Sequence, residues 1–408
     1  MGEKGLVDFF EQYLQRESIF KNKTALQLQH TPEQILHRDE QIQQFAKVIA
    51  PCLKSEKPSN LFIYGKPGTG KTLIVRHVTD NIAKISQNRH LPIKIIYANC
   101  KLKHIADTEY RLLVQLLREF NKIIPPTGLP TEEVYRFFYQ TIDEQPLQLV
   151  LVLDEIDELV GKVGNDVLYN LTRCSSILQK TQVTLIGICN NLMFTDALDP
   201  RVKSSLSEEE LIFPPYNATQ LQGILRARAK EAFQPDVLAS GVIEKCAAYA
   251  AREHGDARRA IDLLRVAGEL AERSMVEKVT LEHLDAAEEK LEKDNIIDAI
   301  TNQPKQYHTV FYAICRLAAA NKNTMFTGEV YAKYQGVCEW AKLRPLTQRR
   351  VSDVLGELDM LGLIHAPIIS KGRYGRTRQI QLTFSPEIIR KITSILEESL
   401  ALSSHVES

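Results

Sequence analysis

The stretch LFIYGKPGTGKTLIVRHVTDN, Leu61–Asn81, decides the fold, because a buried strand, a glycine-rich turn and an amphipathic helix follow one another directly. Its central part matches G-x-x-x-x-G-K-[ST] at every fixed position. Glycines let backbone amides wrap a phosphate at a helix N-terminus, where the helix dipole favours an anion. We therefore predict an ATP site in which Lys71 reaches the β- and γ-phosphates and Thr72 ligates Mg²⁺. The predicted phosphate-binding residues are Gly65, Lys66, Pro67, Gly68, Thr69, Gly70, Lys71 and Thr72.

Besides the glycine-rich turn, an acidic side chain is needed to hold the metal ion. The apolar run LQLVLVLDE, 147–155, ends in Asp154 and Glu155. We predict that Asp154 ligates Mg²⁺ and that Glu155 acts as general base on the attacking water. An acid pair at a strand end also occurs as a plain solvated turn, so the interpretation depends on the glycine-rich turn earlier in the chain.

The composition bears on three properties: nucleic-acid binding, disulfide formation and membrane insertion. The 51 basic and 51 acidic residues cancel, so net charge gives no hint of a nucleic-acid partner. The seven cysteines include no CxxC pair and are expected to be buried thiols in a reducing compartment. No apolar run approaches the length of a membrane span, so we expect a cytoplasmic protein without a membrane partner.

An Asp-Glu pair rather than a lone Asp is typical of the AAA+ branch of P-loop ATPases, and this resemblance implies three further residues. Asn190, at the end of LIGICNN, would contact the γ-phosphate or the attacking water. Arg258, in HGDARRAIDLLR, would be the arginine of a helical lid; the alternative is a solvated helix arginine. Arg201 would be offered to a neighbouring subunit, with Lys203 as second choice and a plain surface loop as the alternative.

The pattern of strands and helices predicts an α/β fold with further domains behind it. Four nearly continuous apolar runs alternate with helical patterns, which indicates a doubly wound parallel sheet. After about Pro214 the strand signal stops and helices follow, up to a charged stretch at 288–306. We predict an N-terminal lead-in (1–30), an AAA+ α/β domain (31–215), an all-α lid (216–300) and a C-terminal winged helix (301–400). The predicted strands are 60–65, 93–99, 147–155 and 183–190.

The C-terminal region carries the nucleic-acid signal. PLTQRRVSDVLGELDMLGL, 345–363, predicts a recognition helix whose start is polar at Thr347, Gln348, Arg349 and Ser352. Its core face would hold Val351, Val354, Leu355, Leu358 and Leu361. The next run, IISKGRYGRTRQI, has no acidic residue and predicts a hairpin that contacts double-stranded DNA. Its contact residues would be Lys371, Arg373, Tyr374, Arg376 and Arg378. A protein-binding winged helix is the alternative.

The ordered set LHRDEQI, GKPGTGKT, VLDEID, GICNN, LDPRVKSSLSEEELIFPPY and HGDARRAIDLLR, followed by a basic winged helix, resembles the archaeal replication initiators of the Orc/Cdc type. These are relatives of the largest subunit of the eukaryotic origin recognition complex. The resemblance implies an ATP-switched, nucleoid-associated protein that binds replication-origin DNA, initiates or regulates replication and helps load the replicative helicase. It implies weak hydrolysis of ATP to ADP and association with other initiator copies.

The resemblance also implies particular contacts. Leu36, His37 and Arg38 would line the adenine pocket, and Tyr216 and Arg228 would touch the nucleotide from the lid; for Tyr216 a packing role at a helix start is the alternative. An insertion at 121–134 would meet DNA through its tip, or would be a structural loop. Its contact residues would be Lys122, Thr127, Gly128 and Leu129.

Two other functions remain open. A nucleotide-regulated transcription factor could carry the same winged helix. An oligomeric motor or clamp loader is the other, although Arg201–Ser205 lacks the Ser-Arg-Cys of clamp loaders.

Overall fold

The computed structural model describes residues 17–27, 30–32, 34–101, 108–125, 127–194, 198–206, 208–320, 324–370, 376–382, 384 and 386–401. The chain divides into two compact units, unit 1 (Met1–Asp285) and unit 2 (Ala286–Ser408). Across the described ranges, no helix combines the length and apolar character needed to cross a lipid bilayer.

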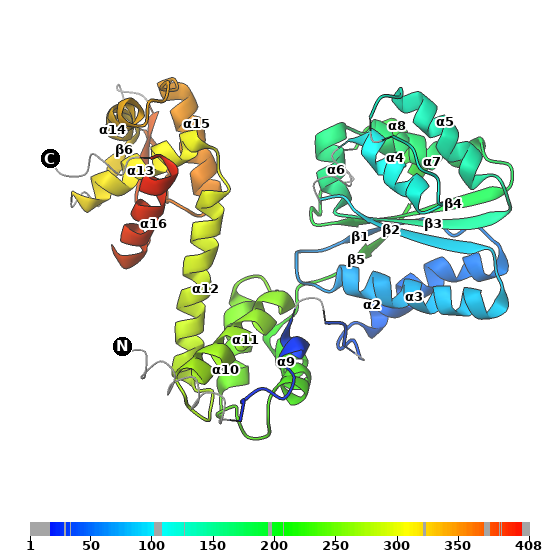
Figure 1. Ribbon diagram of the computed structural model, residues 1–408, viewed down its shortest axis with the longest axis horizontal. Helices are drawn as coiled ribbons and strands as arrows, with labels where there is room; N and C mark the ends of the chain where they lie inside the picture. Colours follow the sequence, from blue (N-terminus) through cyan, green and yellow to red (C-terminus); the bar gives the residue numbers. More distant parts are fainter. Residues whose placement is uncertain are drawn as a thin grey trace, which may run out of the picture. The chain divides into compact units, whose positions relative to one another are not determined.

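A five-stranded parallel sheet forms the centre of unit 1 (Figure 1). The strand order is β2-β3-β4-β1-β5. Because every neighbouring pair is parallel, the C-terminal ends of all five strands meet at one edge. The strands are β1 (Asn60–Tyr64), β2 (Ile93–Asn99), β3 (Leu147–Asp154), β4 (Thr181–Cys189) and β5 (Glu208–Ile212). The sequence predicted the first four and missed β5, because an edge strand that begins with three glutamates shows no apolar run.

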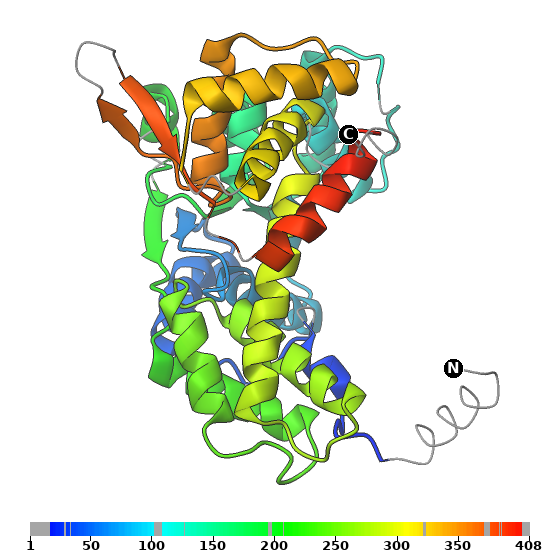
Figure 2. The same cartoon turned by 90° about the vertical axis from the view of Figure 1, so that its left-hand side faces the viewer.

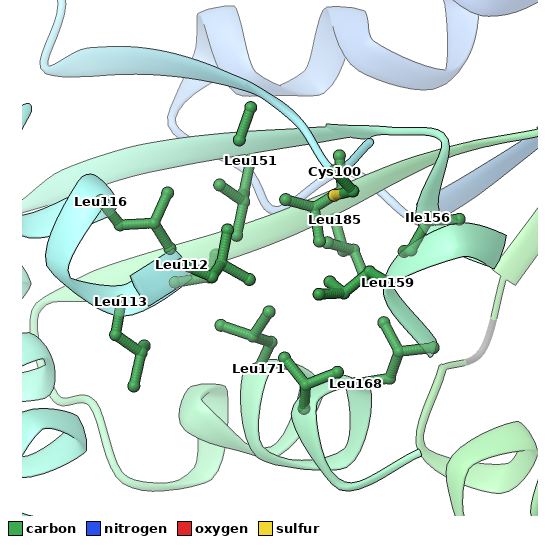
Figure 3. Close-up of a cluster of buried hydrophobic side chains, with 14 of the residues drawn as sticks. Cys100, Leu112, Leu113, Leu116, Leu151, Ile156, Leu159, Leu168, Leu171 and Leu185 are labelled. Atoms are coloured by element: carbon green, nitrogen blue, oxygen red, sulfur yellow. The ribbon is translucent and has the colours of Figure 1, made fainter. Parts of the chain in front are cut away.

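Helices cover both faces of the sheet, and the side chains of β3 alternate between the two layers. Leu149, Leu151 and Leu153 join the core on one face of the sheet, part of which Figure 3 shows, whereas Val150 and Val152 join the core on the other face. One layer consists of α2 (Asp39–Ile49) and α3 (Lys71–Arg89) (Figure 1). The other consists of α4 (Glu109–Arg118), α5 (Thr131–Ile142), α6 (Ile156–Val163), α7 (Asp166–Arg173) and α8 (Pro200–Leu206). The predicted doubly wound α/β architecture is confirmed.

Three helices that lie wholly within unit 1 follow β5 and belong to the lid. They are α9 (Ala218–Ala232), α10 (Val242–Arg252) and α11 (Ala257–Arg273). Asn217 begins α9 with a reciprocal capping box to Gln220, and Asp256 caps α11 by accepting from the Arg258 and Arg259 amides. The patterns around α9 and α11 were predicted as helices, so the caps that start them were readable in the sequence.

The described part of the lead-in packs on the lid. The Phe20 ring stacks on Phe233 with centroids 4.8 Å apart, and the amides of Lys21 and Asn22 both donate to the Ala232 carbonyl. A short 3-10 helix, η1 (Lys23–Leu26), contacts α9 and α11. Two more short 3-10 helices lie in the α/β part, η2 (Ala50–Lys54) and η3 (Cys174–Ser176).

Helix α12 (Leu281–Thr301) begins in unit 1 and ends in unit 2, and it covers most of the charged stretch that the sequence treated as a separator. Unit 2 then has the order of a winged helix, with β7 and β8 coloured orange to red in Figure 2. Its elements are α13 (Lys305–Ala319), β6 (Met325–Phe326), α14 (Thr327–Trp340), α15 (Gln348–Met360), β7 (Ile368–Ser370), β8 (Arg376–Ile380) and α16 (Pro386–Ser399). The C-terminal helix α16 was not predicted.

The recognition helix α15 buries the face that the sequence assigned to the core, with one exception. Val351, Val354, Leu355 and Leu358 are at most 1% exposed. Leu361 is 45% exposed, so its assignment to the core was wrong. The helix ends at Met360, and the helical periodicity on which that assignment depended no longer holds one residue later. All seven cysteine side chains are buried, as predicted.

Candidate nucleotide site and nucleic-acid interface

The glycine-rich turn between β1 and α3 borders a cavity of about 100 Å³. Gly68 and Gly70 have φ angles of +72° and +91°, which L side chains rarely adopt, so the turn requires glycine at both positions. The cavity is lined by Pro67, Gly68, Thr69, Gly70, Lys71, Thr72, Lys101, Asp154, Glu155, Asn190 and Arg258. The parallel sheet brings these residues together, because β1, β3 and β4 end at the same edge.

The Lys71 side chain is buried beneath the turn. Its ammonium donates to the Gly65 carbonyl (2.6 Å), the Lys66 carbonyl (2.9 Å) and Asn190 Oδ1 (2.9 Å). Burial lowers the Lys71 pKa to about 8; Asp154 opposes this shift and the Arg258 guanidinium adds to it. A phosphate placed in the cavity would give this crowded cation an anionic partner.

Two oxygen ligands suited to a hard divalent cation lie together. Thr72 Oγ1 donates to Asp154 Oδ2 at 2.8 Å, and the Tyr97 hydroxyl donates to the same oxygen. The other carboxylate oxygen, Asp154 Oδ1, accepts from the Glu155 amide at 3.0 Å. A threonine hydroxyl beside a carboxylate is a donor set that fits Mg²⁺. Tyr97 was not predicted, because a tyrosine inside an apolar strand resembles any other core residue.

Glu155 and Asn190 both line the cavity, and their roles as general base and γ-phosphate contact stay predictions. Glu155 follows β3 in a left-handed conformation (φ 56°, ψ 47°), and its carboxylate faces Lys101 Nζ at 3.2 Å. Asp157 Oδ2 accepts from the amides of Asn190 and Asn191, both at 3.2 Å, which fixes the start of the loop after β4. The sequence missed both Lys101 and Asp157, since lone charged residues after a strand carry no distinctive pattern.

Arg258 reaches the cavity from the lid, through an α11 N-terminus that contacts the glycine-rich turn directly. The Ala257 amide donates to the Gly68 carbonyl at 3.2 Å, and Lys66 Nζ lies 3.3 Å from His254 Nδ1. A Cβ added at Gly68 would lie 1.6 Å from Asp256 Oδ1, so this contact also excludes any side chain at Gly68. The structure therefore brings the predicted lid arginine to the predicted phosphate site.

Arg38 ties the segment before α2 to the glycine-rich turn and to the start of the lid. Its side chain is 2% exposed; Nε donates to the Thr69 carbonyl at 3.1 Å and Nη2 donates to the Pro214 carbonyl. The guanidinium lies over the Tyr216 ring, 3.9 Å from its centroid. Burial raises the pKa of Tyr216. Tyr216 thus packs on Arg38 beside Gly70, which is the packing alternative from the sequence, and its nucleotide contact stays a prediction.

The other residues expected near the base lie at the same segment. Leu36 is half-buried, and His37 is exposed with a φ of 60°. The His37 ring is close to α9, because a Cβ added at Gly223 would lie 2.6 Å from His37 Nε2. This proximity to the lid fits a binding edge between the two parts of unit 1, and the adenine contacts stay predictions.

Arg228 and Arg201 lie away from the cavity-lining residues. Arg228 is buried, and its guanidinium donates to the carbonyls of Ala25 (3.2 Å) and His30 (3.0 Å) in the lead-in. Arg201 is exposed on α8 and pairs with Asp199 through two of its nitrogens. Arg228 thus anchors the lead-in on the lid, and the roles of both arginines toward a nucleotide stay predictions.

Unit 2 has a groove of about 450 Å³ beside the recognition helix. Gln348 and Arg349 line it, and their DNA contacts stay predictions, whereas Thr347 caps α15 by accepting from the Arg350 amide. Arg378 lines the groove but is also structural, since Nη1 donates to the Ala366 carbonyl at 2.9 Å. The complete lining is Thr327, Gly328, Gln348, Arg349, Ser352, Ile368, Thr377 and Arg378. The predicted hairpin residues Lys371, Arg373 and Tyr374, and the side chain of Arg376, lie outside the described part of the structure.

The loop between α4 and α5 holds the other predicted DNA contacts. Thr127 and Gly128 are exposed. Leu129 is half-buried and packs on the core beneath α4 and α5, so it anchors the loop, and its DNA contact stays a prediction. Lys122 Nζ forms an ion pair with Glu144 at 2.9 Å, so its positive charge is already balanced by a neighbouring carboxylate. Ile123 is 93% exposed, a feature that the sequence did not single out.

Comparisons with known proteins cover nearly the whole chain. Family models described as an AAA domain, a Cdc6 AAA+ ATPase-type lid domain and a CDC6 C-terminal winged helix domain match residues 54–191, 222–289 and 298–392. The chain is 50% identical over 387 residues to an ORC1-type DNA replication protein of Pyrococcus abyssi, covering 94% of this chain and 92% of that protein. It is 47% identical over 391 residues to ORC1-type DNA replication protein 1 of Methanosarcina acetivorans, covering 95% and 94%.

Solved structures give a matching fold. The Aeropyrum pernix ORC1 protein in complex with DNA has a TM-score of 0.84 and 40% identity, covering 94% of this chain and 98% of that chain. Cdc6p from Pyrobaculum aerophilum has a TM-score of 0.59 at 20% identity, covering 95% and 100%, and supports the fold alone. The first of these structures contains DNA, and the match to it covers nearly the whole of this chain.

Proposed function

The chain belongs to the family of ORC1-type DNA replication proteins, and from that membership we propose that it is an ATP-switched protein that binds replication-origin DNA and helps load the replicative helicase. ATP or ADP with Mg²⁺ would occupy the cavity at the glycine-rich turn. Double-stranded DNA would bind the winged helix. The observation that carries the switch is the convergence of Lys71 from the α/β part and Arg258 from the lid on one small cavity.

The proposed reaction is slow hydrolysis of ATP to ADP. Lys71 and Arg258 would balance the charge of the phosphates, and Asn190, which already bonds Lys71 Nζ, would orient the γ-phosphate or the water. Glu155 would accept the proton of the attacking water. A Mg²⁺ ion, held by Thr72 and Asp154, would neutralise the phosphate oxygens.

The switch itself follows from where the lid touches the phosphate site. The start of α11 is hydrogen-bonded to the Gly68 carbonyl, and Arg258 is the next residue but one after its cap, Asp256. Loss of the γ-phosphate removes an anion that Arg258 would bind, so ATP and ADP favour different lid positions. Helix α12 is the covalent link from the lid to the winged helix, and identical lid positions in ATP and ADP complexes would contradict this mechanism.

On the DNA side, the groove bordered by Gln348 and Arg349 supplies the base-reading surface, because the first turn of a recognition helix faces the major groove. The related protein solved in complex with DNA supports DNA binding by this chain. Exposed Arg201 on α8 would face a neighbouring initiator copy.

The experiment that tests the proposal is selection of bound genomic fragments at controlled salt, with and without ATP. Enrichment of repeated sites at a replication origin that depends on ATP is the expected result. Enrichment of promoter sites alone would favour the transcription-factor alternative. Binding that does not exceed that of a polyanion control such as heparin would reject sequence-specific DNA recognition altogether.

A further inference from the structure

The first turn of α6 lies against the end of β4, the strand next to β3 in the sheet. Helix α6 begins directly after β3, and Glu155 precedes its first residue, Ile156. Gly187 of β4 leaves room for this packing, because an added Cβ would lie 2.5 Å from the Phe62 ring and 3.3 Å from Ile156 Cδ1. Asp157, the second residue of α6, thereby comes within hydrogen-bonding reach of the loop after β4.

The Asp157 carboxylate makes its hydrogen bonds with that loop. Its Oδ2 accepts from the amides of Asn190 and Asn191, both at 3.2 Å. The other oxygen, Oδ1, is shielded from solvent and accepts no hydrogen bond from any described residue. Because a buried acceptor without a donor costs free energy, local stability alone does not explain an acid at this position.

The same loop connects Asp157 to the phosphate cavity. Asn190 Oδ1 accepts from Lys71 Nζ at 2.9 Å, and both residues line the cavity together with Glu155. The bonds from the Asn190 and Asn191 amides to Asp157 fix the main chain from which the Asn190 side chain projects. One turn of α6 therefore holds both groups proposed to act on the attacking water. Glu155 belongs to the same stretch of chain, and Asn190 is held through its amide.

We propose that Asp157 is a positioning residue that keeps Asn190 in register with Glu155, so that both meet the same attacking water. This inference rests on the proposed ATPase function. In hydrolysis the water oxygen forms a bond to the γ-phosphorus, the bond to the leaving ADP oxygen breaks, and a proton of the water passes to the Glu155 carboxylate. A misplacement of about 1 Å in groups of this kind can slow a reaction by about 100-fold. ATP affinity should change much less, because Asp157 is not among the described residues that line the cavity.

The test compares Asp157→Ala, Asn190→Ala and the double variant with the wild type, in the full chain under saturating Mg²⁺ and ATP. Asp157→Asn keeps an oxygen that can accept from the two amides. Glu158→Ala is the matched control, because Glu158 is an exposed acid in the same turn of α6. The readouts are the single-turnover hydrolysis rate, the separately measured ATP dissociation constant, and amide hydrogen exchange of the loop after β4 in the nucleotide-free protein.

The expected result is a loss of rate that depends on Asn190. Asp157→Ala should slow hydrolysis by about 10- to 100-fold with little change in ATP affinity, and Asp157→Asn should recover most of the rate. In the Asn190→Ala background, Asp157→Ala should cause little further loss, because the two residues act as one unit. Amide exchange at Asn190 and Asn191 should rise by about tenfold or more in Asp157→Ala and stay unchanged in Glu158→Ala.

Three results would overturn the proposal. Losses of rate that multiply in the double variant would show that Asp157 and Asn190 act independently. A wild-type rate in Asp157→Ala would show that the loop needs no such hold. A loss confined to ATP affinity is what a merely structural role produces. A wild type that binds no ATP would reject the proposed function, a separate result, and the exchange measurement would still decide whether Asp157 holds the loop.

Discussion

Replacing Arg38 by methionine tests whether this buried arginine joins the parts of the nucleotide site. Methionine fills a similar volume without charge. The substitution removes the donors to the Thr69 and Pro214 carbonyls and the guanidinium that covers the Tyr216 ring. We therefore expect both unit 1 stability and nucleotide affinity to fall, because Thr69 belongs to the phosphate-binding turn.

The expected loss can be worked from these three contacts. A buried carbonyl left without its donor costs about 1–3 kcal/mol, and a lost cation–π contact costs about 0.5–2 kcal/mol. Methionine also avoids the cost of burying a guanidinium, which offsets part of the loss. We expect the free energy of unfolding of unit 1 to fall by about 3 kcal/mol.

Urea unfolding followed by far-UV circular dichroism measures this change. The single tryptophan, Trp340, lies in unit 2, so its fluorescence should show an unchanged midpoint and serves as an internal reference. The control variant is Arg226→Met, because Arg226 forms an exposed ion pair with Glu244 and should cost at most about 1 kcal/mol. If Arg38→Met is no more destabilising than Arg226→Met, the bonds and the stacking contribute little and the reasoning is refuted.

Three further predictions concern the metal, the phosphate and the DNA. Tyr97→Phe removes the hydroxyl that donates to Asp154 Oδ2. A hydrogen bond to a charged group is worth about 1.5–3 kcal/mol, so the Mg²⁺ concentration needed for tight ATP binding should change by about tenfold or more, and an unchanged Mg²⁺ titration would contradict this. The Lys71 pKa is lowered to about 8, so much of this lysine is neutral near pH 8.5 in the free protein, and ATP binding there should take up a proton, which calorimetry in buffers of different ionisation enthalpy detects. Between about pH 8 and 10.5 the unfolded state holds more protons than the folded state, so Lys71 makes the free energy of unfolding rise with pH in that window. Lys71→Met should remove both effects. Arg349 lines the groove, and Arg349→Ala should weaken duplex binding by about 1–3 kcal/mol. Its neighbour Arg350 is paired with Glu357, so Arg350→Ala should weaken duplex binding much less. Equal losses of binding free energy in the two variants would place the DNA elsewhere.

Much of the α/β fold and the phosphate site was readable from the sequence, because both depend on local patterns. Apolar runs marked the covered strands, and the glycine-rich turn marked the point where β1 meets α3. The edge strand β5 was missed because it begins with three glutamates, which an edge strand can expose to solvent, and so shows no continuous apolar run. Leu361 was assigned to the core by a periodicity that stops with the helix at Met360.

The parts of the site that the sequence could not supply depend on tertiary contacts. Lys101 and Tyr97 reach Glu155 and Asp154 only because β2 pairs in parallel with β3, and no spacing in the sequence encodes that register. The bonds from the Arg228 guanidinium to carbonyls of the lead-in, about two hundred residues earlier in the chain, could not be read from the sequence either, and its nucleotide contact stays a prediction. Asp256 is readable in the sequence as a helix cap, but its contact with Gly68, where the lid meets the phosphate turn, is not.

The central claim is that the nucleotide held between the α/β part and the lid controls how the protein binds a DNA duplex. The most direct measurement is the duplex dissociation constant over a salt titration with ATP, with ADP and without nucleotide, for the wild type and for Lys71→Ala. We predict that the wild-type constant differs between ATP and ADP, and that Lys71→Ala binds duplex DNA equally in all three conditions. One identical wild-type constant in every nucleotide condition would contradict the account, even if the protein binds both ATP and DNA.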